Sequence, residues 1–357
     1  MGSSARLLAV FLGAAVLFVP VLAVLPDAPA TPGGMIQKRV PQHLMIAEPG
    51  TAGPMPLPAS GASASGQPPQ TMVVGTDDIV VVPIEFSNRN HASGRDLSYF
   101  DTMFNNPSGP SVNGFYRENS YGLFGVQGTV TNWVRSSRTM ENYGDDSTSG
   151  VDDQNGAIYR LVVEAVTLAN PFVDFSQFDR DGDGVVDHIV IVHAGGAQES
   201  TPSSETLIWS HRWAVVDGNP TVPGDQRLVA DGVQIYGYIM ISEDSPIGVV
   251  AHEFGHDLGL PDLYDTDGSS LGVGEWDVMG TGSWNAIPPN RQGTSPAHFG
   301  AWAKAILGWL TPIEVTAPLL DWEIPAVETL GTVFRLTIKQ TGKGDEYYLV
   351  ENRQPNG

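Results

Sequence analysis

The sequence has no cysteine, and this absence excludes disulfide bonds, thiolate metal ligands and thiol catalysis. It is also poor in positive charge, because 18 Lys and Arg residues stand against 40 Asp and Glu residues and give a formal net charge of −22. A surface of this sign repels nucleic acid and anionic membranes, so we expect neither as a partner. The charge is typical of an exported, cation-binding protein, although a surface that is acidic only for solubility fits it equally well.

Long apolar runs are missing beyond the N-terminus. There, Arg6 precedes an almost continuously apolar stretch over residues 7–25, with small-residue cleavage sites at 21–23 and 28–30. We interpret residues 1–30 as a signal peptide, which predicts a secreted protein with no stable membrane partner after cleavage. An uncleaved membrane anchor is the alternative, because the apolar run is long for a signal peptide.

The rest of the chain divides by composition. Residues 31–71 are rich in Pro, Gly, Ala and Ser, so they are predicted to form a largely disordered pro-segment or linker. Residues 72–310 are predicted to form one catalytic domain, and residues 311–357 the start of a β-rich region that is truncated here or continues into a further domain. Pro83 indicates that its strand is an edge strand or is irregular. The patterns predict strands at 79–86, 124–133, 188–193, 206–213 and 233–241, and helices at 111–121, 155–169 and 295–307.

The strongest chemical signal is a pair of histidines four residues apart, His252 and His256, with Glu253 directly after the first. On a helix both imidazoles lie on one face and reach one metal ion. Glu253 then projects about 100° away, where it can act on a metal-activated water without being a ligand. Gly259 is expected to end the helix in a left-handed turn, which would bring Asp262 back as a third ligand. A helix with two hydrogen-bonded, partly buried histidines is the alternative.

Two flanking segments bear on this motif. Ser245 is expected to be the N-cap of the helix and Pro246 its first residue. About twenty residues further on, Met279 lies in a glycine-rich turn over residues 272–284, where we expect it to form a soft, apolar floor beneath the metal-binding histidines. Taken without the histidine motif, a methionine in a loop more often serves only packing.

A second constellation is an acidic loop over residues 179–187. Its carboxylates stand at loop positions 1, 3, 5 and 9 and its glycines at positions 4 and 6, which matches the start of an EF-hand calcium loop. The twelfth position is Val190 rather than a bidentate glutamate, so the loop is expected to lead into a strand and to bind Ca²⁺ in a structural role. An acidic turn without an ion is the alternative. The expected calcium ligands are Asp179, Asp181, Asp183, Val185 and Asp187.

Together these segments resemble the immune inhibitor A family of secreted bacterial zinc metallopeptidases, which is related to the metzincins. The resemblance covers the chain from about Met72 onward. It implies an α+β, zincin/metzincin-like catalytic domain with a twisted β-sheet, active-site and backing helices and a β-rich C-terminal continuation. It also implies a secretory pro-segment and bound calcium. The segments that carry it are Phe115–Gly122, the acidic loop with His193–Gly196, the histidine motif with Pro261–Asp265, Trp276–Met279 and Ser295–Trp302.

Two positions depart from the ordinary metzincin pattern. Asp262 stands where most metzincins carry a histidine, so an oxygen replaces a nitrogen at the metal. Thr281 stands two residues after the turn methionine, where many relatives place an oxyanion-stabilising tyrosine, and that role stays unassigned.

The sequence thus predicts a secreted zinc endopeptidase that acts on proteins and peptides, with Zn²⁺ and Ca²⁺ as its metals. His252, His256 and Asp262 are the predicted zinc ligands, and Glu253 is the predicted general base. The alternative is a calcium-stabilised extracellular surface or matrix protein with a structural, non-catalytic metal site. A zinc hydrolase of non-peptide amides or esters is a third possibility.

Overall fold

The computed structural model describes residues 5–6 and 72–354, apart from 149, 151, 202–203, 216–227, 266–268 and 342–343. The predicted signal peptide and pro-segment therefore lie almost wholly outside the described residues. Its centre is a six-stranded mixed sheet in the order β3-β2-β5-β9-β6, with β4 paired to the end of β2. The neighbours β3, β2, β5 and β9 run parallel, and β6 is antiparallel to β9. These strands are β2 (Gly75–Glu85), β3 (Phe124–Val130), β4 (Val134–Arg135), β5 (Ile189–His193), β6 (His211–Ala214) and β9 (Gly237–Ser242).

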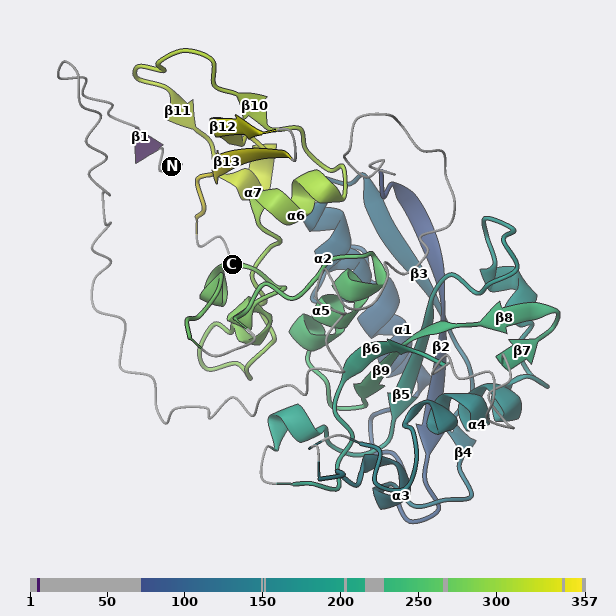
Figure 1. Cartoon of the computed structure of the whole chain (residues 1–357). Helices are drawn as coiled ribbons and strands as arrows, with labels where there is room; N and C mark the ends of the chain where they lie inside the picture. The colour runs from purple at the N-terminus through teal and green to yellow at the C-terminus, as the bar shows by residue number, and fades with distance from the viewer. Residues whose placement is uncertain are drawn as a thin grey trace.

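Helices cover both faces of this sheet, and smaller strands complete the fold (Figure 1). Among the described residues, no helix is both long and apolar enough to cross a bilayer. The α-helices are α1 (Leu97–Asn105), α2 (Val112–Asn119), α3 (Glu141–Gly144), α4 (Tyr159–Ala169), α5 (Ile247–Asp257), α6 (Ala301–Ile306) and α7 (Val327–Leu330). Short 3₁₀ helices are η1 (Phe175–Phe178), η2 (Gln198–Ser200), η3 (Gly274–Trp276) and η4 (Thr281–Trp284). The other strands are β1 (Ala5–Arg6), β7 (Leu228–Ala230), β8 (Val233–Ile235), β10 (Ile313–Glu314), β11 (Glu323–Ile324), β12 (Phe334–Thr341) and β13 (Gly344–Val350).

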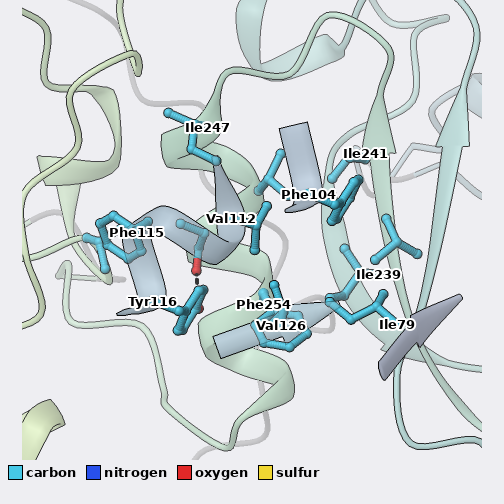
Figure 2. Close-up of a cluster of buried hydrophobic side chains, with 14 of the residues drawn as sticks. Ile79, Phe104, Val112, Phe115, Tyr116, Val126, Ile239, Ile241, Ile247 and Phe254 are labelled. Carbon is cyan, nitrogen blue, oxygen red and sulfur yellow. Dashed lines mark hydrogen bonds between the residues drawn. The ribbon is translucent and has the colours of Figure 1, made fainter. Parts of the chain in front are cut away.

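The sheet separates two apolar cores, because successive side chains of a strand point to opposite faces. In β2, Ile79 and Val81 enter the core formed with α1, α2 and α5, whereas Val80 and Val82 enter the core formed with α4. Figure 2 shows the first of these cores, where strand isoleucines meet aromatic and aliphatic side chains of the helices. Continuous β-branched runs such as that of β5 follow from this burial on both faces.

Helix α5 lies against the sheet and is anchored by α2. The hydroxyl of Tyr116 in α2 donates a 2.8 Å hydrogen bond to the carbonyl of Ala251, the residue before His252 (Figure 2). Tyr116 is fully buried, and its ring contacts Phe254 edge-on with centroids 5.1 Å apart. The aromatic segment that opens the family resemblance thus holds α5, the helix of the histidine motif, in place.

The C-terminal part of the described chain forms a small separate layer, at the top of Figure 1. Strands β10, β12 and β13 make a three-stranded sheet, and β1 pairs with β11. The layer is tied back to the rest by Tyr121, whose hydroxyl donates to the carbonyl of Val327 at 2.6 Å, and by Arg353, whose guanidinium donates to the carbonyl of Phe299 at 2.8 Å.

Several sequence predictions were wrong in detail because long-range partners take up the local backbone. The predicted helix at 295–307 is helical only from Ala301, since the N–H groups of Ser295 and Ala297 bind the carbonyls of Asn285 and Gly282. The predicted strand at 206–213 begins only at His211, because side-chain carboxylates take the N–H groups of the residues before it. The strand predicted at 233–241 is two strands, β8 and β9.

Two further predictions need correction. Ser245 does not cap α5. The helix begins after Pro246, and the Ser245 hydroxyl accepts the N–H of Ser242 instead. Pro83 lies in an internal strand and not at an edge, so of the two possibilities that the sequence left open the irregularity is the one that the structure contains. On one side it pairs with Val192 of β5. On the other side the pairing with β3 ends at Val81 and the pairing with β4 begins at Ile84, so no backbone N–H is needed from Pro83 there.

Candidate metal centre and active site

Helix α5, which carries the histidine motif, ends in a turn that folds the chain back on itself. Gly259 has a φ of +93°, a conformation that glycine adopts without steric strain. The N–H of Leu260 then binds the carbonyl of Gly255 at 3.0 Å, one of the otherwise unpaired carbonyls at the helix end. This reversal brings Asp262 beside the two histidines one turn earlier.

Three candidate ligand atoms converge at this place. The Nε2 atoms of His252 and His256 are 3.1 Å apart, and they lie 3.1 and 3.2 Å from Oδ1 of Asp262. A tetrahedral zinc ion with bonds of about 2.0–2.1 Å separates its ligand atoms by about 3.3 Å. Oδ1 of Asp262 is buried and makes no hydrogen bond among the described residues. The donor set, its spacing and this unsatisfied oxygen all fit a zinc ion.

Backbone carbonyls orient both imidazoles. Nδ1 of His252 lies 2.8 Å from the carbonyl oxygen of Val278, and Nδ1 of His256 lies 2.8 Å from that of Leu260. A carbonyl only accepts, so each Nδ1 must carry the hydrogen, and each Nε2 lone pair is left to face a metal. These partners come from two different loops, which sequence spacing did not reveal.

The charges at the centre are strongly coupled. Burial acts to lower the pKa of His252, but the nearby carboxylates of Asp262 and Glu253 outweigh it and raise that pKa to about 9. Burial likewise opposes the ionised form of Asp262, yet the two histidines hold its pKa well below the ordinary value. Asp262 is therefore ionised at neutral pH, as a metal ligand must be.

Glu253 lies beside this group but is not part of it. Glu253 is 7% exposed, and its carboxylate accepts a hydrogen bond from the backbone of Arg212 in β6. Burial raises the pKa of Glu253, whereas the charges of His252 and His256 act in the opposite direction. Among the described residues, no fourth His, Asp or Glu completes the ligand group of His252, His256 and Asp262.

Tyr264 is a site residue that the sequence reasoning left without a role. It follows Asp262 by two positions, its hydroxyl is a hydrogen-bond partner of Asp262, and its ring stacks on His252 with centroids 6.3 Å apart. Its only sequence signal was its place in the motif that continues past the histidines. Thr281, which stands where many metzincins carry a tyrosine, is the first residue of η4.

Met279 lies under the middle of α5. It is fully buried, and a Cβ built on Gly255 would come within 2.6 Å of its sulfur. Asp277 shapes the turn, because its two carboxylate oxygens accept the N–H groups of Met279 and Gly300 at 2.8 and 2.7 Å. The turn therefore supports the helix at the residue between the two histidines.

The acidic loop brings three of its five predicted calcium ligands together. One carboxylate oxygen each of Asp179, Asp181 and Asp183 lies within 4.8 Å of the others, and Oδ1 of Asp179 is buried without a hydrogen bond among the described residues. Asp187 is outside this group, and its carboxylate accepts the N–H of Arg180 at 2.8 Å. Val185 lies in a bridge to Gln234 at the end of the loop.

The mixed α/β scaffold presents two helical histidines, an aspartate and an adjacent buried glutamate. This combination is typical of a metallohydrolase site. The family model for the immune inhibitor A peptidase M6 catalytic domain matches residues 86–310, which is more than half of the chain. The chain therefore belongs to the immune inhibitor A family of peptidases.

Curated relatives agree with this assignment. The chain is 34% identical over 250 residues to Immune inhibitor A of Bacillus thuringiensis subsp. alesti. It is 32% identical over 243 residues to the Pre-pro-metalloprotease PrtV of Vibrio cholerae. The alignments cover 61% and 60% of this chain but only 36% and 25% of those relatives. The chain thus spans only about a third of the first relative's length and a quarter of the second's.

Proposed function

We propose that this protein is a secreted, zinc-dependent endopeptidase that hydrolyses peptide bonds of proteins. One observation carries the proposal. The two imidazole nitrogens and the Asp262 oxygen lie within 4.8 Å of one another, with the carboxyl group of Glu253 beside them. A structural zinc site normally has four protein ligands, and here the described residues supply three. An open position of this kind is what a hydrolytic site needs.

Each residue has a definite task in this proposal. His252, His256 and Asp262 would hold the zinc ion, in orientations kept by their backbone partners and by Tyr264. When bound, zinc supplies Lewis acidity, which makes water a better nucleophile at neutral pH and polarises the scissile carbonyl. Glu253 would take a proton from the attacking water and pass it to the leaving amine, and its raised pKa suits both transfers.

Strand β6 supports an extended polypeptide as the substrate. It is the last strand of the central sheet and pairs antiparallel with β9, and none of the described strands covers its other side. An extended peptide binds such an edge by adding a strand. Because the backbone of Arg212 in β6 binds the Glu253 carboxylate, a peptide added there would run past the proposed general base.

The remaining features of the proposal concern export and calcium. A signal peptide over residues 1–30 would direct secretion, and a pro-segment over residues 31–71 agrees with the pre-pro name of the Vibrio cholerae relative. Asp179, Asp181 and Asp183 would bind Ca²⁺ in a structural role, since three close carboxylates repel one another unless a cation neutralises them. The catalytic domain would be metzincin-like, with β-rich structure following it.

The test is cleavage of unfolded casein by the zinc-loaded full chain and by its Glu253→Gln variant. We expect the variant to keep its zinc and to lose about 10²–10⁴-fold in kcat. Glu205→Gln is the matched control, because Glu205 is an exposed glutamate outside the helix and the turn that form the site. Equal turnover by the parent and Glu253→Gln would refute the role of Glu253. Full zinc occupancy without cleavage of any protein, peptide or ester would favour the calcium-stabilised surface protein with a structural metal.

A further inference from the structure

The guanidinium group of Arg353 reaches from the C-terminal layer to the turn that lies under the histidine motif. It donates one hydrogen bond to the carbonyl of Phe299 at 2.8 Å and another to the carbonyl of Trp276. The Arg353 side chain is 11% exposed, and its Nε donates to the carboxylate of Glu351 at 2.8 Å. Arg353 lies beyond residue 310, where the match to the family's catalytic domain ends. A residue outside the matched domain therefore contacts the turn that supports the candidate active site.

That turn bonds to the surroundings of two of the three candidate metal ligands. The carbonyl of Val278 lies 2.8 Å from Nδ1 of His252 and orients its imidazole. The next carbonyl, that of Met279, accepts the N–H of Leu263 at 2.8 Å, and Leu263 directly follows Asp262. A displacement of the turn would therefore move a histidine and the aspartate together.

Asp277 joins the same two segments that Arg353 joins. It is 3% exposed, its Oδ1 accepts an N–H within the turn at 2.8 Å, and its Oδ2 accepts the N–H of Gly300 at 2.7 Å. The carbonyls that bind Arg353 belong to the residues directly before Asp277 and Gly300. The two side chains thus fix one pair of segments through both its N–H groups and its carbonyls. A planar guanidinium with five N–H donors suits this task, because it can bond several carbonyls at once.

We propose that Arg353 is a positioning residue of the metal centre. Its hydrogen bonds run to backbone carbonyls and to Glu351, so it acts on the candidate ligands only through the turn. By holding the turn, it keeps Nε2 of His252 and Oδ1 of Asp262 at the 3.1 Å spacing that suits a zinc ion. This role rests on the zinc site of the proposed function, but not on turnover of a substrate. It also makes the C-terminal layer part of the catalytic unit.

A simpler role for Arg353 would be to attach the C-terminal layer, and Tyr121 offers the comparison. The hydroxyl of Tyr121 donates to the carbonyl of Val327 in α7 at 2.6 Å and accepts Nζ of the buried Lys304 in α6 at 3.2 Å. These bonds attach the layer without including the turn. Tyr121→Phe removes both of them and leaves the hydrogen bonds of Arg353 in place. Attachment of the layer and support of the turn can therefore be tested separately.

Zinc affinity, measured on the full chain by competition with a chelating dye, tests the proposal. We expect Arg353→Ala to weaken zinc binding by about 10–100-fold, the usual effect of removing an outer partner of metal ligands. Tyr121→Phe is expected to lower the unfolding temperature and to keep the parent affinity. Co²⁺ in place of zinc gives a second measurement, because its visible absorption bands depend on the arrangement of its ligands. These bands should shift in Arg353→Ala and stay unchanged in Tyr121→Phe.

Arg353→Lys is the second variant, and circular dichroism shows whether each protein folds. An ammonium group cannot reproduce the fork of the guanidinium, so we expect a smaller but measurable loss of zinc affinity. If Arg353→Ala does not fold, Arg353→Lys decides alone. The proposal is wrong if no folded variant of Arg353 binds zinc more weakly than the parent, or if Tyr121→Phe loses as much affinity. A parent that binds zinc but cleaves no casein would refute the proposed function, and the zinc affinities would still decide the role of Arg353. A parent that binds no zinc would overturn both.

Discussion

The imidazole of His188 is hydrogen-bonded to the carboxylate of Asp257, with Nδ1 2.6 Å from Oδ2. Its other nitrogen lies 3.3 Å from Asp77, and the second oxygen of Asp257 accepts Nε of Arg212 at 2.9 Å. Burial acts to lower the pKa of His188, but the bonds and charges of Asp257 and Asp77 raise it to about 10. His188 directly follows the acidic loop and Asp257 directly follows His256, so one buried ion pair joins the two candidate metal sites.

We expect His188→Gln to lower the free energy of unfolding by about 3 kcal/mol, because the Asp257 side chain, which is 5% exposed, then keeps only Arg212 as a cationic partner. Urea denaturation of the zinc-loaded protein measures the change. His91→Gln is the control, since His91 makes an equally short contact of 2.6 Å with Glu85 but its side chain is 33% exposed. That pair should contribute less than about 1 kcal/mol. Equal losses in the free energy of unfolding in both variants would mean that burial adds nothing to the contribution of the His188–Asp257 ion pair.

Removal of the Tyr264 hydroxyl should weaken zinc binding by about 10–100-fold, since outer partners of metal ligands typically have effects of this size. Tyr264→Phe keeps the ring stacked on His252 and removes only the hydrogen bond to Asp262. Competition with a chelating dye measures the affinity. Tyr348→Phe, at a tyrosine that is 63% exposed, should show the parent affinity. A Tyr264→Phe protein with unchanged zinc affinity would show that the hydroxyl does not position Asp262.

Gly248 in the first turn of α5 is expected to tolerate no side chain. A Cβ there would lie 1.9 Å from the carbonyl oxygen of Ser283, which is backbone and cannot rotate away. We therefore expect Gly248→Ala to destabilise the protein by about 3 kcal/mol, although alanine is the better helix former. Gly255→Ala should cost less, because it meets the flexible side chain of Met279 at 2.6 Å.

Thermal unfolding of both variants can be compared with Gly196→Ala, where a Cβ meets nothing within 4 Å. If Gly248→Ala were as stable as Gly196→Ala, the close packing of α5 on the loop at Ser283 would be wrong.

Glu199 should make stability fall as the pH rises from about 4.5 to 7. Burial is the main cause that raises its pKa from 4.5 to about 7, so the folded state keeps a proton that the unfolded state has lost between these values. The contribution of protonated Glu199 to the free energy of unfolding is complete below about pH 4.5. It falls by at most about 3 kcal/mol as the pH rises toward 7. Glu199→Gln cannot titrate, so its stability relative to the parent should rise over this range.

Urea denaturation between pH 4.5 and 8 in calcium-free buffer measures this difference. Glu205→Gln, at an exposed glutamate nearby, should show the parent's pH dependence. A parent and a Glu199→Gln variant with parallel pH profiles would show that Glu199 does not hold its proton in the folded protein.

Sequence reasoning succeeded where the relevant physics is local. Two histidines four residues apart must share a helix face, and a glycine beyond them is suited to reverse the chain, so the approach of Asp262 could be expected. The β-branched run of β2, the alternation of β3 and the apolar run of β5 likewise predicted strands that the structure contains. Prediction failed around 206–210 and 295–300, where the backbone bonds to segments distant in sequence. Local propensity carries no information about such partners.

By itself the sequence determined the chemistry that we propose for this protein, because residue type and helical spacing are enough to indicate a candidate metal-binding pair with an adjacent carboxylate. Only the tertiary structure decided how that pair is held. The carbonyls of Val278 and Leu260 that orient the histidines, the Tyr116 bond to Ala251 and the bridge from His188 to Asp257 all join residues or loops whose contact depends on packing.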